Sequence, residues 1–173
     1  MTDAGRSRTQ WLNRPLSRRY GWVLIDVASV RLRDAEGLHD HRVRWAFGWL
    51  ADGECEALGA WMDREGGSDE AGRLLMDLRA RGLERMWHAW GPGLGTGQEQ
   101  ERAPQSPGLE ADQVREALTR AIRRRGSFES ADAVLDFMAG ALQRAERRLD
   151  RERLVARGRP RLESGAQMAS PGI

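Results

Sequence analysis

One carboxylate inside an apolar strand constrains this chain more than any other feature. Residues 21–33 read Gly-Trp-Val-Leu-Ile-Asp-Val-Ala-Ser-Val-Arg-Leu-Arg, a β-forming run with Asp26 at its centre. An ionised carboxylate in such a strand is costly unless it is paired with a cation or binds a metal. The sequence therefore predicts a sheet built around this strand. Within it, the Asp26 carboxylate is expected to have a cationic partner or to bind a metal ion.

Further strands and a helix are expected to complete the sheet. Apolar residues alternate with others over residues 38–50, and residues 54–62 follow as a third strand after an Asp-Gly turn. An amphipathic helix that Ser68 is expected to cap comes next, and then a short strand over residues 83–90. A strand, helix and strand of these lengths favour parallel pairing, so the last strand is expected beside residues 21–33.

The composition changes at Gly91, and the chain beyond it is expected to add helices and no further strand. Residues 91–108 are rich in Gly, Pro and polar residues, which is typical of a flexible linker. Two helices with apolar faces are predicted within residues 109–157. Residues 158–173 are expected to be a disordered tail, and residues 1–20 a basic lead-in segment.

Charge and cysteine content exclude several kinds of site. All basic side chains are Arg, and the 28 of them nearly balance 26 acidic residues, for a net charge of +2. The single cysteine, Cys55, excludes an internal disulfide and a cysteine-based zinc site, and His39 and His41 are weak metal candidates without cysteine partners. No apolar run approaches the roughly 20 residues of a membrane span, and the N-terminus has no signal-peptide core. A cytoplasmic protein without a membrane partner is expected.

An ordered series of short motifs resembles the Mutator-type transposases of bacterial insertion sequences. The series covers most of residues 11–145 and includes Trp11-Leu-Asn-Arg-Pro-Leu16, Leu24-Ile-Asp26, Phe47-Gly48, Glu56-Ala-Leu-Gly-Ala-Trp61, Leu78-Arg-Ala-Arg-Gly82 and Leu118 to Gly126. The resemblance implies an α/β fold with a ribonuclease-H-like sheet over residues 21–90. In that fold three antiparallel strands, a helix and a parallel fourth strand occur in the order read above, here followed by the linker and two C-terminal helices.

The resemblance also implies an acidic triad that holds two Mg²⁺ or Mn²⁺ ions for DNA strand cleavage and transfer during transposition. Asp26 matches the first acid. The position of the second acid, at the end of the fourth strand, holds Trp90. Counting back from Arg125 without gaps places the third acid at Asp112, with Glu110 two residues away. The catalytic candidates are therefore Asp26, Asp112 and Glu110, with Asp26 and Asp112 as metal ligands.

Loss of the second acid predicts an inactive copy of such a transposase. A two-metal site needs several well-placed carboxylates, and the family's long insertion and N-terminal DNA-binding region have no counterpart in this sequence. Little or no strand-transfer activity is expected from this truncated, internally deleted chain, and whether it is an enzyme stays open. On the alternative reading, Asp26 is paired with an arginine, and Asp112 and Glu110 are ordinary first-turn helix residues.

The resemblance implies DNA as the partner, and arginine suits contacts with phosphate, although a solvated basic segment with some packing by Trp11 is the favoured reading of residues 1–20. The candidate contacts are Arg14, Arg18 and Arg19 in the lead-in segment and Arg120, Arg123, Arg124 and Arg125 on the first C-terminal helix. The arginines of the last helix alternate with acids, which favours i,i+4 pairing on a solvated face. Two alternatives to a transposase remain: a non-catalytic module that binds DNA, an intact transposase or itself, and the functionless product of a decayed mobile element.

Overall fold

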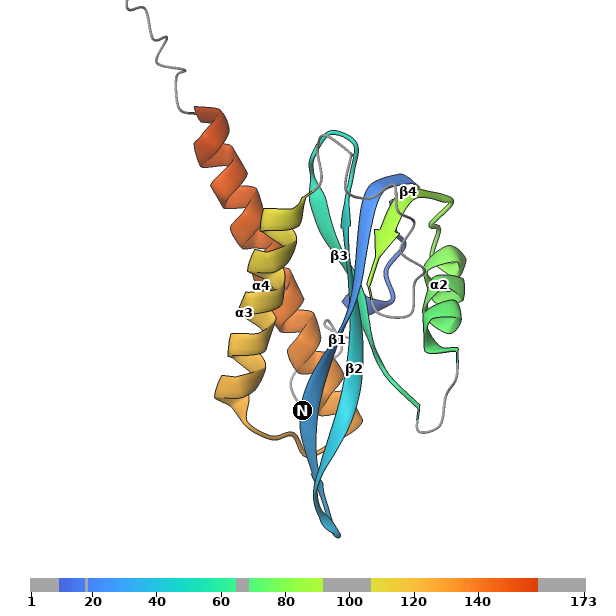
Figure 1. The fold of residues 1–173 in the computed structure, drawn as a ribbon, viewed down its shortest axis with the longest axis vertical. Coiled ribbons are helices and arrows are strands. Elements are labelled where there is room, and N and C mark those ends of the chain that lie inside the picture. The colour runs from blue at the N-terminus through green and yellow to red at the C-terminus, as the bar shows by residue number, and fades with distance from the viewer. Residues whose placement is uncertain (1–9, 18, 65–68, 92–106, 159–173) are drawn as a thin grey trace, which may run out of the picture.

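In the computed structural model the sheet forms around its longest strand, β1 (Arg19–Asp34). The structure describes residues 10–17, 19–64, 69–91 and 107–158. β2 (Gly37–Trp49) pairs antiparallel with β1, β3 (Cys55–Met62) pairs antiparallel with β2, and β4 (Arg85–Trp90) pairs parallel with β1. The order is therefore β3-β2-β1-β4 (Figure 1). This arrangement confirms the predicted α/β architecture, with a mixed sheet and a parallel fourth strand.

Helices cover both faces of the sheet (Figure 1). α2 (Glu70–Ala80) lies on one face, and α3 (Gly108–Arg125) and α4 (Ala131–Gly158) lie on the other, as the two predicted C-terminal helices. The prediction that Ser68 caps α2 is wrong, because the side chain of Asp69 accepts the N–H of Gly72 at 2.9 Å and supplies the cap. The predicted linker and tail lie almost entirely outside the described residues. No helix among the described segments is long and apolar enough to cross a membrane.

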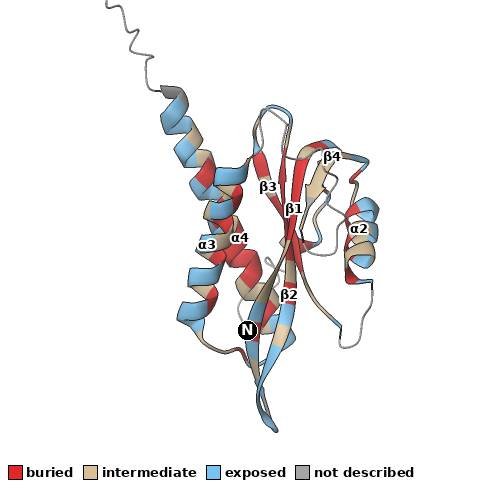
Figure 2. Ribbon diagram, viewed as in Figure 1, coloured by how far each residue is buried: buried red, intermediate tan, exposed pale blue. Residues whose placement is uncertain are grey.

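Two hydrophobic cores lie on opposite sides of β1, which explains its nearly continuous apolar run. Val23 and Ile25 pack with the apolar face of α2, and Trp22 and Leu24 pack with α3 and α4. Buried residues lie along β1 and β2 and on the helices of both faces (Figure 2). Because side chains alternate along a strand, Asp26 lies on the α3 side of the sheet.

The predicted lead-in segment contributes to the edge of the fold. Leu12 and Leu16 are buried, and the N–H of Leu16 donates to the carbonyl of Arg81 at 2.8 Å. The guanidinium of Arg14 donates to the carbonyl of Ala57 at 2.9 Å and lies 4.3 Å from the ring centroid of Trp11. Arg14 is therefore engaged within the fold.

A partly buried carboxylate fastens α4 to β3. Glu146 accepts the N–H of Ala57 at 2.9 Å. Burial raises the pKa of Glu146 above its ordinary value; the Ala57 hydrogen bond and Arg14 lower this pKa, whereas Glu56 and Asp150 raise it. The folded chain therefore holds a proton on Glu146 more tightly than the unfolded chain does.

Replacement of Glu146 by Gln is expected to remove one component of the pH dependence of stability. With the folded pKa raised, Glu146 contributes a loss of stability as the pH rises from the ordinary carboxyl pKa through the raised one. Urea unfolding from about pH 4 to 8 should show this loss in the wild type and less of it in Glu146→Gln. Glu152→Gln, an exposed change on the same helix, should keep the wild-type profile. Identical profiles for the wild type and Glu146→Gln would contradict the assignment.

Candidate functional site

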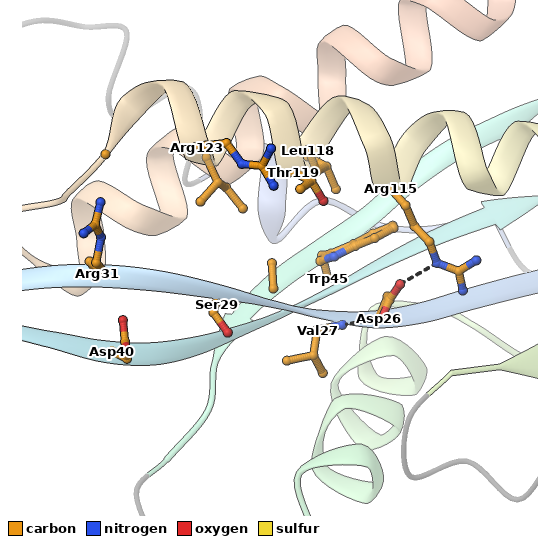
Figure 3. Close-up of a pocket in the computed structure, with 13 residues that line it drawn as sticks. Asp26, Val27, Ser29, Arg31, Asp40, Trp45, Arg115, Leu118, Thr119 and Arg123 are labelled. Carbon is orange, nitrogen blue, oxygen red and sulfur yellow. Dashed lines mark hydrogen bonds and ion pairs between the residues drawn. The ribbon is translucent and has the colours of Figure 1, made fainter.

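Asp26 forms a short ion pair with helix α3. Nε of Arg115 donates to Oδ2 of Asp26 at 2.6 Å, and the N–H of Val27 donates to Oδ1 at 2.8 Å (Figure 3). The side chain of Asp26 is 19% exposed and that of Arg115 is 36% exposed. Both carboxylate oxygens therefore have partners, and the guanidinium compensates the charge that β1 carries. This pairing is the alternative that the sequence left open for Asp26.

Asp112 shares the same guanidinium. Nη1 of Arg115 donates to Oδ1 of Asp112 at 3.1 Å, and the Asp112 side chain is 72% exposed. The structure thus brings the two predicted metal ligands, Asp26 and Asp112, to one arginine. Sequence reasoning did not identify Arg115. The i,i+3 spacing of Arg115 from Asp112 could have indicated that ion pair. No sequence pattern indicates the pairing of Arg115 with Asp26, which lies 89 positions earlier.

Glu110, the other catalytic candidate, lies in different surroundings. Its Oε2 accepts Nε1–H of Trp49 at 2.6 Å, and its Oε1 accepts Nε–H of Arg153 at 3.1 Å. A second bond runs from Arg153 to Oε2. Glu110 therefore joins β2, α3 and α4, and it lines a cavity that Asp26 does not line. The structure does not bring Glu110 and Asp26 together.

Position 90, where the resemblance implies the second acid, lies at the end of β4. Trp90 is in parallel register with Leu24, two residues before Asp26 on the neighbouring strand. Gly91 follows with a φ of +150°, and its backbone approaches the carbonyl of Ile25 closely. The end of β4 is thus near Asp26 in the sheet, but its last residue is not a carboxylate.

The residues present do not fit a two-metal centre. Asp26 and Asp112 are both bonded to Arg115, and Glu110 is bonded to Trp49 and Arg153. Within residues 10–17, 19–64, 69–91 and 107–158, no group of three or more His, Cys, Asp or Glu side chains is placed to hold a metal ion. The assignment of Asp26 and Asp112 as ligands of Mg²⁺ or Mn²⁺ stays a prediction, and no catalytic step through such ions is derived.

A groove of about 510 Å³ runs between β1 and α3 beside the Asp26–Arg115 pair (Figure 3). Its apolar lining comes from buried residues of the sheet and of α3, among them Trp45 and Leu118. The polar lining comes from two hydroxyl groups, three arginines and two carboxylates: Ser29, Thr119, Arg31, Arg115, Arg123, Asp26 and Asp40. We call this cavity the β1–α3 groove.

The arginines predicted to contact DNA differ in how far the fold uses them. Arg14 lies 3.7 Å from Glu56 and is mostly buried, and Arg120 lies 3.7 Å from Glu116 on the surface of α3. Arg125 lies over the ring of Phe128, with 5.8 Å to its centroid. The remaining described candidates are exposed, namely Arg19, Arg123 and Arg124. Arg18 lies outside the described residues. Contact with DNA stays a prediction for all of them.

The single thiol, Cys55, is a poor candidate for a nucleophile or a metal ligand. Cys55 is buried, and burial raises its pKa to about 12, with Asp150, Glu110 and Glu146 adding to the rise and Arg153 opposing it. Burial therefore leaves Cys55 with very little of the thiolate form that acts as a nucleophile or a metal ligand.

Comparison with known proteins identifies relatives for the first half of the chain. Residues 5–87 match the family model described as transposase, Mutator family. The probable transposase for insertion sequence element ISRM3-like of Sinorhizobium fredii is 35% identical over 75 residues, which is 43% of this chain and 19% of that protein. The transposase for insertion sequence element ISRM3 of Rhizobium meliloti gives the same identity and the same coverage.

The chain therefore spans about a fifth of the length of these relatives. The family match includes Asp26 and ends before position 90, Glu110 and Asp112. The resemblance read from the motifs is confirmed. Of the three acid positions that the resemblance implies, only the first, Asp26, lies within the matched residues. The positions of the second and third acids lie beyond them.

Proposed function

We propose that this chain, whose residues 5–87 match the model of the Mutator family of transposases, takes part in DNA transposition as a DNA-associated protein without a working two-metal centre. The observation that carries this proposal is the ion pair between Arg115 and Asp26, the family's first acid by resemblance. A guanidinium in contact with a carboxylate repels a divalent cation from it and must be displaced before the cation can bind.

We also assign the sheet to the ribonuclease-H-like fold. Three antiparallel strands, a helix and a fourth strand parallel to the first occur here in the order that the resemblance implies. In that assignment, Asp26 on the central strand and position 90 at the end of its parallel neighbour lie close together at one end of the sheet. Trp90 then replaces the carboxylate that would complete the metal site.

Arg115→Ala is expected to expose a weak cation site that the wild type lacks. Titration calorimetry with Mn²⁺ should show no binding by the wild type at millimolar concentrations. Binding of a single ion is expected once Asp26 and Asp112 no longer share the guanidinium. Unfolding free energy should fall by only about 1 kcal/mol, because both partners are partly exposed.

Two further variants make this experiment decisive. Asp26→Ala in the Arg115→Ala background should abolish the new binding, whereas Arg120→Ala, which removes an exposed arginine of the same helix, should leave the wild-type result unchanged. Binding of two ions by the wild type, lost in Asp26→Ala, would show that the site is complete and would overturn the proposal.

A further inference from the structure

We propose that the β1–α3 groove binds a phosphate group of a DNA strand without a metal ion, through the guanidinium groups of Arg31 and Arg123. This inference rests on the proposed association with DNA. It extends that proposal by naming the groove, the contacting side chains and the ligand group.

The charge of the groove favours an anion. Three arginines and two aspartates line it, a net charge of one positive unit. The charge of Arg115 is used by Asp26 and Asp112. Arg31 and Arg123 have no ion pair within the described part of the chain, and they extend into the groove from β1 and from α3 (Figure 3). The Asp26–Arg115 pair thus neutralises the acid that would attract a cation, and the other two arginines remain available to an anion.

Backbone hydrogen bonds connect β1 at Arg31 to the chain just beyond α3. The N–H of Phe128 donates to the carbonyl of Arg31, and the N–H of Arg33 donates to the carbonyl of Phe128, each at 2.8 Å. Phe128 is 1% exposed and anchors the connection between α3 and α4 in the core. Arg123 lies in the last turn of α3, five residues before Phe128. This connection limits the backbone entropy that the site loses when it binds its ligand.

The chemistry of the lining suits a phosphodiester. The planar donor fork of arginine matches two phosphate oxygens, and the hydroxyl group of Thr119 can donate a further hydrogen bond. Buried Trp45 also lines the groove, and apolar surroundings strengthen charge interactions. Asp40 lies opposite Arg31 in the β1–β2 register and opposes an anion. Binding of one phosphate is therefore expected to be weak and to need both arginines.

Dimethyl phosphate, the smallest phosphodiester, tests the groove directly. Its titration into the whole chain with EDTA present should shift the amide NMR signals of Ser29, Thr119 and Gly126 in a saturable way. Arg31→Gln and Arg123→Gln should each weaken this binding about tenfold. Arg144→Gln, which changes an exposed arginine of α4 outside the groove, should not. Unchanged spectra in the wild type, or equal weakening by all three variants, would overturn the proposal.

A labelled DNA duplex separates failure of the groove from failure of the proposed function. Anisotropy titrations in EDTA should show binding that weakens linearly in log affinity against log salt. The slope should fall by about one in Arg31→Gln and Arg123→Gln. Absence of duplex binding by the wild type, with dimethyl phosphate still bound, would contradict the proposed function and exclude DNA as the source of the phosphate. Duplex binding that is unaffected by either variant, or that requires Mn²⁺, would overturn the groove as its site.

Discussion

Replacement of Gly91 by alanine is expected to lower the free energy of unfolding by about 3–4 kcal/mol. A Cβ at this position would lie 2.7 Å from the carbonyl carbon of Ile25 and closer still to its oxygen. The atoms it meets are backbone, so relief requires a shift of β1 or of the end of β4. The φ of +150° is also one that residues with side chains rarely adopt. A loss of this size is a large fraction of the stability of an ordinary domain.

Urea unfolding followed by tryptophan fluorescence measures this effect, and Gly21→Ala is the matched control. Gly21 lies on β1, and a Cβ there would meet only the carbonyl oxygen of Trp49, at an ordinary 3.6 Å. Its effect should stay within about 1 kcal/mol. Ile25 directly precedes Asp26. A urea midpoint for Gly91→Ala equal to that of the wild type would therefore refute the close approach of the end of β4 to Asp26. It would also remove the basis for placing position 90 near Asp26.

The sheet was predictable because each strand carries its own local pattern. Apolar residues alternate with others in β2, as expected of a strand that is buried mainly on one face, whereas β1 is apolar almost throughout because both of its faces are buried. The helix between β3 and β4 indicates a crossover connection and therefore a parallel fourth strand. The N-cap of α2 was harder to predict, because Ser68 and Asp69 are adjacent and both serine and aspartate are common N-cap residues. Local patterns locate an element well and its first residue poorly.

The partners of the acids were not predictable, because ion pairs across a fold leave no local pattern. Asp26 and Arg115 are separated by 89 positions, and the sequence supplies many arginines that could have served. For Glu110 a local signal did exist. Residues two apart on a helix point about 200° away from each other, so Glu110 and Asp112 were never equivalent candidates for one site. The structure shows this, with Asp112 bonded to Arg115 and Glu110 to Trp49 and Arg153.

Replacement of Glu110 by alanine is expected to lower the free energy of unfolding by about 2–4 kcal/mol. The change leaves Nε1–H of Trp49 without its acceptor and leaves Arg153 without the carboxylate that binds it. Arg153 is only 18% exposed, and its Nη1 is already buried without a hydrogen-bond partner. An uncompensated arginine between α3, α4 and β2 should weaken the docking of both helices on the sheet.

Two control variants separate this structural role from a role as a metal ligand. Glu110→Gln keeps an acceptor for Trp49 but loses the charge, so its cost should fall between those of the wild type and Glu110→Ala. Glu116→Ala removes a carboxylate that is 67% exposed and lies 3.7 Å from Arg120, and it should cost no more than about 0.5 kcal/mol. Carboxylates held together for a metal repel one another, so removing one of them stabilises the metal-free chain. Unchanged or increased stability of Glu110→Ala in urea with EDTA present would therefore contradict the structural role and restore Glu110 as a candidate ligand.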